Sequence, residues 1–180
     1  NTDDPMSPFL IYEGADFAGF EVMEDGTRLF SMGSGKATMS PYKPGEKMNM
    51  DMSINDVYAN FSTAKDPQMK QTMADLGYSE ITGKITMKGS WNPADGRMSI
   101  PEFAYDFKDV GRLTLAVDIS GYTAQFAKQL QDLTKNAATQ DSSAQGMAMM
   151  GLMGQLSFNS MSIRFDDASL TNKLIDYAAK

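Results

Sequence analysis

Apolar and polar residues alternate without interruption in Met48-Asn49-Met50-Asp51-Met52-Ser53-Ile54. Met48, Met50, Met52 and Ile54 fall on one face of an extended chain, and the polar residues fall on the other. Because the side chains of a β-strand point alternately to its two faces, this spacing predicts a half-buried strand. The three thioethers at alternate positions are also soft ligands, so the rest of the chain has to decide between a strand face and a metal site.

The alternation continues on both sides of this stretch. The strand is predicted to run from Lys47 to Phe61, with a β-bulge near Asn55 and Asp56, because the apolar positions change there from even to odd numbers. Residues 81–91 are predicted to form a second strand with one solvent-exposed face, since apolar residues and Gly alternate with Thr, Lys and Ser. Other strands are predicted at residues 17–23, 28–32, 36–40, 98–107, 113–119 and 156–165.

Turn and capping residues separate these strands. Asp25-Gly26 predicts a hairpin turn, since Gly supplies a positive φ. Asp66 and Pro67 are typical of a helix N-cap and first turn, and Gly77 of its end. Amphipathic spacing predicts a second helix from Tyr122 to about Asn136. A final helix follows the capping sequence Asp166-Asp167-Ala168-Ser169.

These elements predict a single α+β domain over residues 1–180. Its fold is a strongly twisted, mainly antiparallel sheet with two or three amphipathic helices packed on one face. The order strand, hairpin, strand, helix occurs twice, at residues 17–76 and 79–136, which suggests an internal duplication. Residues 137–146 are small and polar and predict a flexible loop. The last residues stop inside a helical pattern, so we expect the chain to be a fragment of a longer protein.

Composition excludes several function classes. The 180 residues contain no Cys and no His, which removes thiolate chemistry and the commonest general base and zinc ligand. A net charge of −7 and the lack of a basic cluster argue against nucleic acid as a partner. No apolar run is long enough to cross a membrane. We therefore expect a non-enzymatic protein with no cofactor and no transmembrane segment.

The methionines are the first candidate site. Met is flexible and polarizable, so it suits an adaptable apolar surface, and it also binds Cu(I). An apolar ligand site is predicted at Met48, Met50, Met52, Met149, Met150 and Met153. Cu(I) binding by the same clusters is the alternative, although no His or Cys completes a metal site, and no metal is assigned. Residues 147–153 are expected to form a buried helix over the sheet; the alternatives are a lid, a partner-docking helix or a membrane-touching loop.

Paired carboxylates are the second candidate site. Close pairs occur at Asp106 and Asp109, at Asp166 and Asp167, and at Glu24 and Asp25. All of them fall at turns or helix starts, where Asp is favoured for capping, and none has calcium-loop spacing. A carboxylate-dependent hydrolase is therefore the third hypothesis, and no catalytic residue is assigned. Trp91 beside a turn is expected to be an aromatic at the edge of the core.

Two stretches carry a resemblance to a known group of proteins. They are Gly111-Arg112-Leu113-Thr114-Leu115-Ala116-Val117-Asp118-Ile119-Ser120-Gly121 and Met161-Ser162-Ile163-Arg164-Phe165-Asp166-Asp167-Ala168-Ser169-Leu170. Both resemble uncharacterised proteobacterial envelope proteins that are loosely similar to the AsmA-like group, which is linked to outer-membrane lipid homeostasis. The resemblance implies a periplasmic or cell-envelope location and no enzymatic activity. The expected function is a non-catalytic envelope protein that binds an apolar ligand, such as a lipid, or another envelope protein through its sheet.

Overall fold

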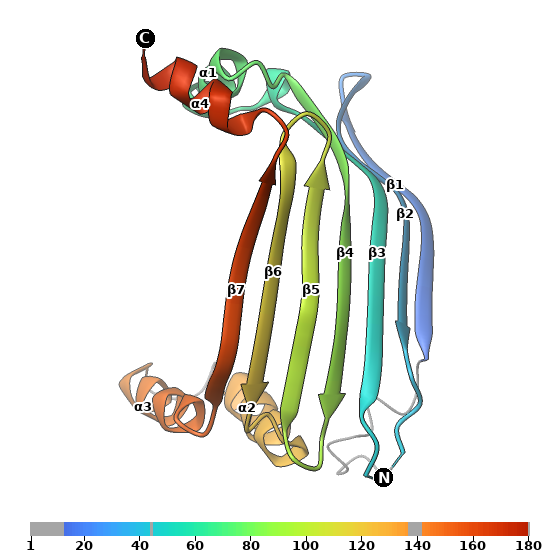
Figure 1. Ribbon diagram of the computed structural model, residues 1–180, viewed down its shortest axis with the longest axis vertical. Coiled ribbons are helices and arrows are strands. Elements are labelled where there is room, and N and C mark those ends of the chain that lie inside the picture. Colours follow the sequence, from blue (N-terminus) through green and yellow to red (C-terminus); the bar gives the residue numbers. More distant parts are fainter. Residues whose placement is uncertain (1–12, 44, 137–141, 180) are drawn as a thin grey trace.

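The computed structural model describes residues 13–43, 45–136 and 142–179. Seven antiparallel strands form one sheet, and each strand pairs with its neighbours in the sequence, in the order β1-β2-β3-β4-β5-β6-β7 (Figure 1). The strands are β1 (Gly14–Glu24), β2 (Thr27–Met39), β3 (Met48–Asn60), β4 (Glu80–Asn92), β5 (Arg97–Phe107), β6 (Gly111–Ser120) and β7 (Ser157–Asp167). The predicted α+β class and antiparallel sheet are confirmed.

In the described residues, four α-helices lie at the two ends of the sheet. They are α1 (Pro67–Asp75), α2 (Ala124–Asn136), α3 (Ser142–Met153) and α4 (Leu170–Ala178); a short 3-10 helix, η2 (Phe61–Thr63), precedes α1. Figure 1 shows α1 and α4 beyond one end of the strands and α2 and α3 at the other. The prediction of two or three helices packed on one face is therefore wrong. Hairpins connect most neighbouring strands, so no described helix has to run back along the sheet.

The local signals of the sequence are confirmed at several turns and bulges. Asp25 and Gly26 have φ values of 50° and 76°, as the predicted hairpin turn requires. The pairing of β3 with β4 shifts between Ile54 and Val57, and Asp56 has a φ of 52°. Pro101 lies in the register shift between Ile100 and Phe103, where a missing N–H costs no regular ladder bond.

The predicted helix start at Asp66 is also confirmed. Its carboxylate accepts hydrogen bonds from the backbone N–H groups of Gln68 (2.8 Å) and Met69 (3.3 Å). The flexible loop predicted at residues 137–146 is wrong for residues 142–146, which belong to α3, and residues 137–141 lie outside the described residues. Ala and Gln favour a helix there, and packing against α2 outweighs the Ser and Gly content.

The large buried side chains gather mainly near the ends of the strands, although Val57 in β3 and Ala104 in β5 are also buried. At the α2 end, Met48 and Trp91 are 0% and 2% exposed, and the Trp91 indole N–H donates to the Tyr122 carbonyl at 2.6 Å. At the opposite end, the buried Tyr78 hydroxyl donates to the Asp109 carbonyl at 2.9 Å. Two separate end clusters therefore anchor the helices, and the middle of the sheet is a single layer.

The order of three strands followed by a helix does occur twice. The first set is β1, β2, β3 and α1, and the second is β4, β5, β6 and α2. This agrees with the order read from the sequence, but a common ancestry of the two halves stays a prediction.

Candidate functional site

The candidate site is one whole face of the sheet, here called the apolar face. Strand pairing places Met52 opposite Met87, Met87 opposite Phe103, and Phe103 opposite Leu115. Directly paired residues lie on the same face of the sheet, and so does every second residue along each strand. The pairs therefore identify all residues of this face. In β3 to β6 its members are Met48, Met50, Met52, Ile54, Val57, Ala59, Ile81, Gly83, Ile85, Met87, Gly89, Trp91, Met98, Ile100, Phe103, Tyr105, Phe107, Leu113, Leu115, Val117 and Ile119. None of them is charged.

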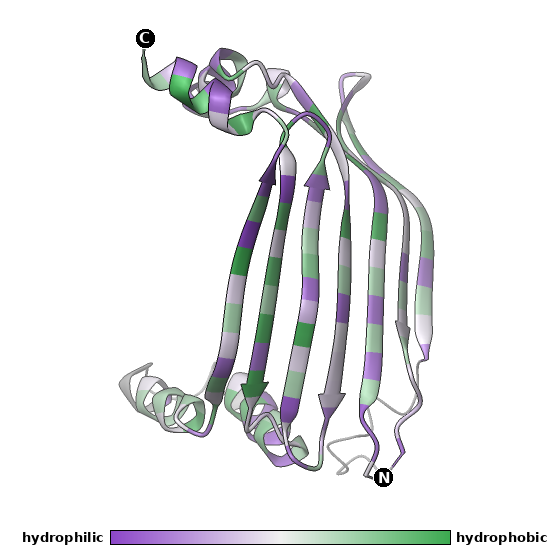
Figure 2. Cartoon of the chain, in the orientation of Figure 1, coloured by the Kyte–Doolittle hydropathy of each residue, from purple (hydrophilic) through white to green (hydrophobic). Residues whose placement is uncertain are grey.

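The opposite face, here called the polar face, carries rows of alternating charge. Asp51 pairs with Lys88, and Lys88 with Glu102. A second row joins Lys84, Asp106, Arg112 and Asp166. Its ion pairs include Lys84–Asp106 at 3.7 Å and Arg112–Asp106 at 3.3 Å. Charged side chains favour contact with water, so this face of the sheet is hydrophilic and the other is apolar. Figure 2 shows the alternation of apolar and polar residues along the strands.

The apolar face has little cover from the described parts of the chain. Tyr122 and Ala124 pack against Met48 and Trp91 at one end. The residues of β7 on this face are exposed to solvent. Phe158 is 74% exposed, and Met161 and Ile163 are similarly open. The total accessible surface is 11535 Å², against about 8,600 Å² for a compact monomer of this mass. An apolar surface of this extent is a recognition site or an aggregation liability.

The six methionines predicted to form the site fall into two separate groups. Met50 and Met52 are half-buried on the apolar face, and Met48 belongs to the end core against Trp91. Met149, Met150 and Met153 belong to α3, beside β7 at the far side of the sheet. Three strands separate β3 from β7, which at about 4.8 Å per strand places the groups roughly 19 Å apart. The structure therefore does not bring all six together.

The segment 147–153 is helical, as predicted, but it does not lie over the sheet. It packs on α2 at the sheet end, where only Leu152 of this segment is buried, while Met147 and Met150 are more than 70% exposed. The prediction of a buried helix is therefore wrong. Apolar residues, including Ala148 and Leu152 as well as the methionines, occur on all sides of this helix, so its sequence has no apolar stripe from which the buried side could have been found.

The paired carboxylates do not form an acid–base pair. Asp106 is paired with Lys84 and Arg112, Asp166 binds Arg164 at 2.8 Å, and Glu24 binds Lys65 at 3.0 Å. The side chain of Asp167 accepts the Thr171 backbone N–H at 2.9 Å and so caps α4. Within residues 13–43, 45–136 and 142–179 no three His, Cys, Asp or Glu residues cluster as metal ligands.

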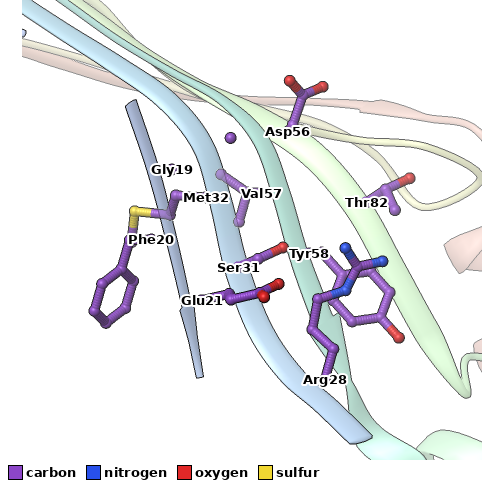
Figure 3. A pocket seen from close by; sticks show the side chains of 11 residues that line it. Gly19, Phe20, Glu21, Arg28, Ser31, Met32, Asp56, Val57, Tyr58 and Thr82 are labelled. Atoms are coloured by element: carbon purple, nitrogen blue, oxygen red, sulfur yellow. The ribbon is translucent and has the colours of Figure 1, made fainter. Parts of the chain in front are cut away.

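A hollow at the bend of the sheet was not predicted from the sequence. Gly19 and Asp56 have positive φ values there, and the hollow of 560 Å³ is lined by residues of β1 to β4 (Figure 3). The Arg28 guanidinium lies 4.4 Å from the centre of the Tyr58 ring. Burial raises the pKa of Tyr58, and Glu80 adds to this effect. The charged residues of its lining are Glu21, Arg28 and Asp56.

Comparison with known proteins gives limited information. A family model described only as "Uncharacterized protein" matches residues 104–180, which include the end of β5 and all of β6 and β7. No curated protein and no solved structure matches the chain. Among the helices in the described residues, none is long and apolar enough to cross a membrane.

Proposed function

We propose that this is a non-catalytic cell-envelope protein that binds the acyl chains of lipids on its apolar face. The observation that carries the proposal is the uncharged face of β3 to β6, which the described helices cover only at one end. Burying such a surface is favourable by roughly 25 cal/mol per Å². Long apolar chains lying on the sheet would supply that burial, and methionines adapt to chains of different shape.

The dimensions of the face favour a long ligand over a compact one. Seven strands about 4.8 Å apart span roughly 29 Å, and eleven residues of strand rise about 36 Å. A small rigid molecule would cover only a fraction of this area, whereas several extended acyl chains would cover most of it. The proposed envelope location and the absence of enzymatic activity rest on the resemblance of residues 111–121 and 161–170.

The experiment compares two neighbouring residues on opposite faces of β6. Leu115 lies on the apolar face between Phe103 and Ile163, and Thr114 lies on the polar face beside Arg164. Leu115→Glu places a charge where the acyl chain would lie, so we expect it to weaken binding of a long-chain fluorescent fatty acid by about tenfold or more. Thr114→Glu is the matched control and should leave the affinity unchanged.

Circular dichroism of both variants checks that the sheet remains folded. Equal weakening by Leu115→Glu and Thr114→Glu, or no binding by the unaltered protein, would contradict the proposal. Native mass spectrometry of protein purified from cell envelopes supplies a second measurement, because bound lipid should appear as an added mass.

Cu(I) binding is a second candidate, and one observation favours it. Met39 pairs with Met50, and Met52 pairs with Met87, so four thioethers come from three neighbouring strands. Thioethers are suitable Cu(I) ligands. Titration of Cu(I) against a competing chelator tests this function, and affinity weaker than micromolar would remove it. The double variant Met52→Leu and Met87→Leu keeps the apolar volume, so it should abolish metal binding and spare lipid binding.

A further inference from the structure

The β7 edge of the sheet is open and apolar at the same time. β7 pairs with β6 on one side, and the other side faces away from the sheet, with no described strand beside it. Eight consecutive residues, Ser160 to Asp167, keep a regular register with β6, and every residue of β7 is exposed. The strand contains no Pro and no Lys, the residues that commonly prevent edge-to-edge pairing. Its outer N–H and C=O groups can therefore accept another strand.

The opposite edge is irregular within the strand, whereas the irregularity of β7 at Asn159 lies near its start. β1 has a positive φ at Gly19 and a register shift between Val22 and Met23, and both features interrupt a regular row of backbone groups. Its charged residues, Asp16, Glu21 and Glu24, are all acidic, so two β1 strands would repel each other.

The elements on both sides of β7 extend the exposed apolar surface. In Figure 1, α3 and α4 project beyond β7 at its start and its end. The large exposed apolar residues of these three elements are Met147, Met150, Met153, Phe158, Met161, Ile163, Phe165, Leu174, Ile175 and Tyr177. Together they expose on the order of 1,000 Å², about twice the largest patch on a typical monomer. A stable homodimer needs about 800 Å² from each partner.

We propose that two copies of this chain pair β7 against β7 in antiparallel orientation, across a twofold axis perpendicular to the sheet. Such an axis keeps both apolar faces on the same side and gives a continuous sheet of both copies. Because the start of one β7 lies beside the end of the other, α3 of one copy meets α4 of its partner. This arrangement covers both exposed helices as well as the strand edge.

Side-chain complementarity selects the register centred on Ile163. In this register Ile163 faces its own counterpart, Met161 faces Phe165 and Ser162 faces Arg164. Apolar residues then meet apolar residues on one face, and no like charges are opposed. A register centred on Arg164 would place two guanidinium groups opposite each other, whereas the Ile163 register also leaves the irregularity at Asn159 outside the paired segment.

Single cysteines test the register directly, because the chain has no Cys of its own. Paired Cα atoms at the axis lie about 4.5–5.5 Å apart, a distance that a disulfide spans. Ile163→Cys should therefore form a covalent dimer rapidly under mild oxidation. Met161→Cys and Phe165→Cys are the controls, since each thiol would lie roughly 13 Å along the strand from its counterpart. Equal rates at all three positions would overturn the proposed register.

Mass measurement by light scattering tests the dimer itself. The unaltered chain should have twice the monomer mass of 19.7 kDa at micromolar concentration. Ile163→Lys opposes two ammonium groups at the axis and should weaken dimerisation about thirtyfold or more. Phe20→Lys makes the same change on the β1 edge and should leave the dimer intact.

A monomer at all concentrations, or loss of the dimer in Phe20→Lys but not in Ile163→Lys, would overturn the proposal. Failure here is distinguishable from failure of the proposed lipid function, because lipid binding is measured with Leu115→Glu on the face and dimerisation with Ile163→Lys on the edge.

Discussion

At the scale of single residues, Asn159 shows how a residue at a β-bulge can lower the pKa of a neighbouring carboxyl group. Its amide donates to the Asp118 carboxylate and to the Ser120 hydroxyl, both at 2.7 Å. Arg97 lies 3.2 Å from the other oxygen of Asp118. The hydrogen bond from Asn159, followed by that from Arg97, holds the pKa of Asp118 below its usual value. A carboxylate with a lowered pKa stabilises the fold above its unfolded-state pKa, and this contribution is lost as the pH falls through the folded-state pKa.

Asn159→Ala should therefore raise the pKa of Asp118 towards its ordinary value, because the ionised form loses its strongest hydrogen bond. A titration of the Asp118 carboxyl carbon by NMR measures the change. The variant should also lose less stability than the unaltered protein as the pH falls through the acidic range. Asn55→Ala removes an amide from another irregular strand position and should leave the pKa of Asp118 where it was; an equal shift in both variants would contradict the assignment.

At the scale of elements, most strands could be predicted from the sequence, but the positions of the helices could not. The two strands predicted at residues 28–32 and 36–40 are one continuous strand, β2. The alternation around Met52 and the parity change near Asp56 are local signals, and they determine the strand and its bulge. The placement of α3 depends on long-range packing against α2, which the alternating pattern does not encode. The site was predicted in part for the same reason: parity places Met50 and Met52 on one face, but it gives no indication of what covers that face.

Two glycines of β4, Gly83 and Gly89, differ in the space that is available for a side chain. A Cβ atom at Gly83 would collide with the Asp106 carbonyl oxygen and lie 2.6 Å from the Phe107 ring, whereas at Gly89 the nearest atom is 3.4 Å away. Gly83→Ala should lower the free energy of unfolding by about 1–3 kcal/mol. Gly89→Ala should change it by less than about 1 kcal/mol, because lower unfolded-state entropy offsets the tighter contact. Urea denaturation measures both, and equal effects would show that the close approach at Gly83 is unimportant.

At the scale of the whole molecule, the uncovered face predicts a strong response to apolar ligands. A ligand at a hundred times its dissociation constant stabilises the folded state by about 2.7 kcal/mol. For a chain of 180 residues this corresponds to a rise in melting temperature of roughly 5–10 °C. Scanning calorimetry with a long-chain fatty acid should show this rise. Butyrate is the control, since its short chain buries too little area, and an equal rise with butyrate would point to a carboxylate effect instead.

The order of the strands in the sheet has a consequence for how the chain acquires its structure. Every strand from β2 to β7 pairs with the strand synthesised just before it. A strand that leaves a ribosome or a translocation channel therefore finds its partner already present and does not have to wait for a distant segment. Local pairing of this kind keeps the loop-closure entropy low and favours rapid folding. The sheet can thus be completed one hairpin at a time, in the direction of synthesis.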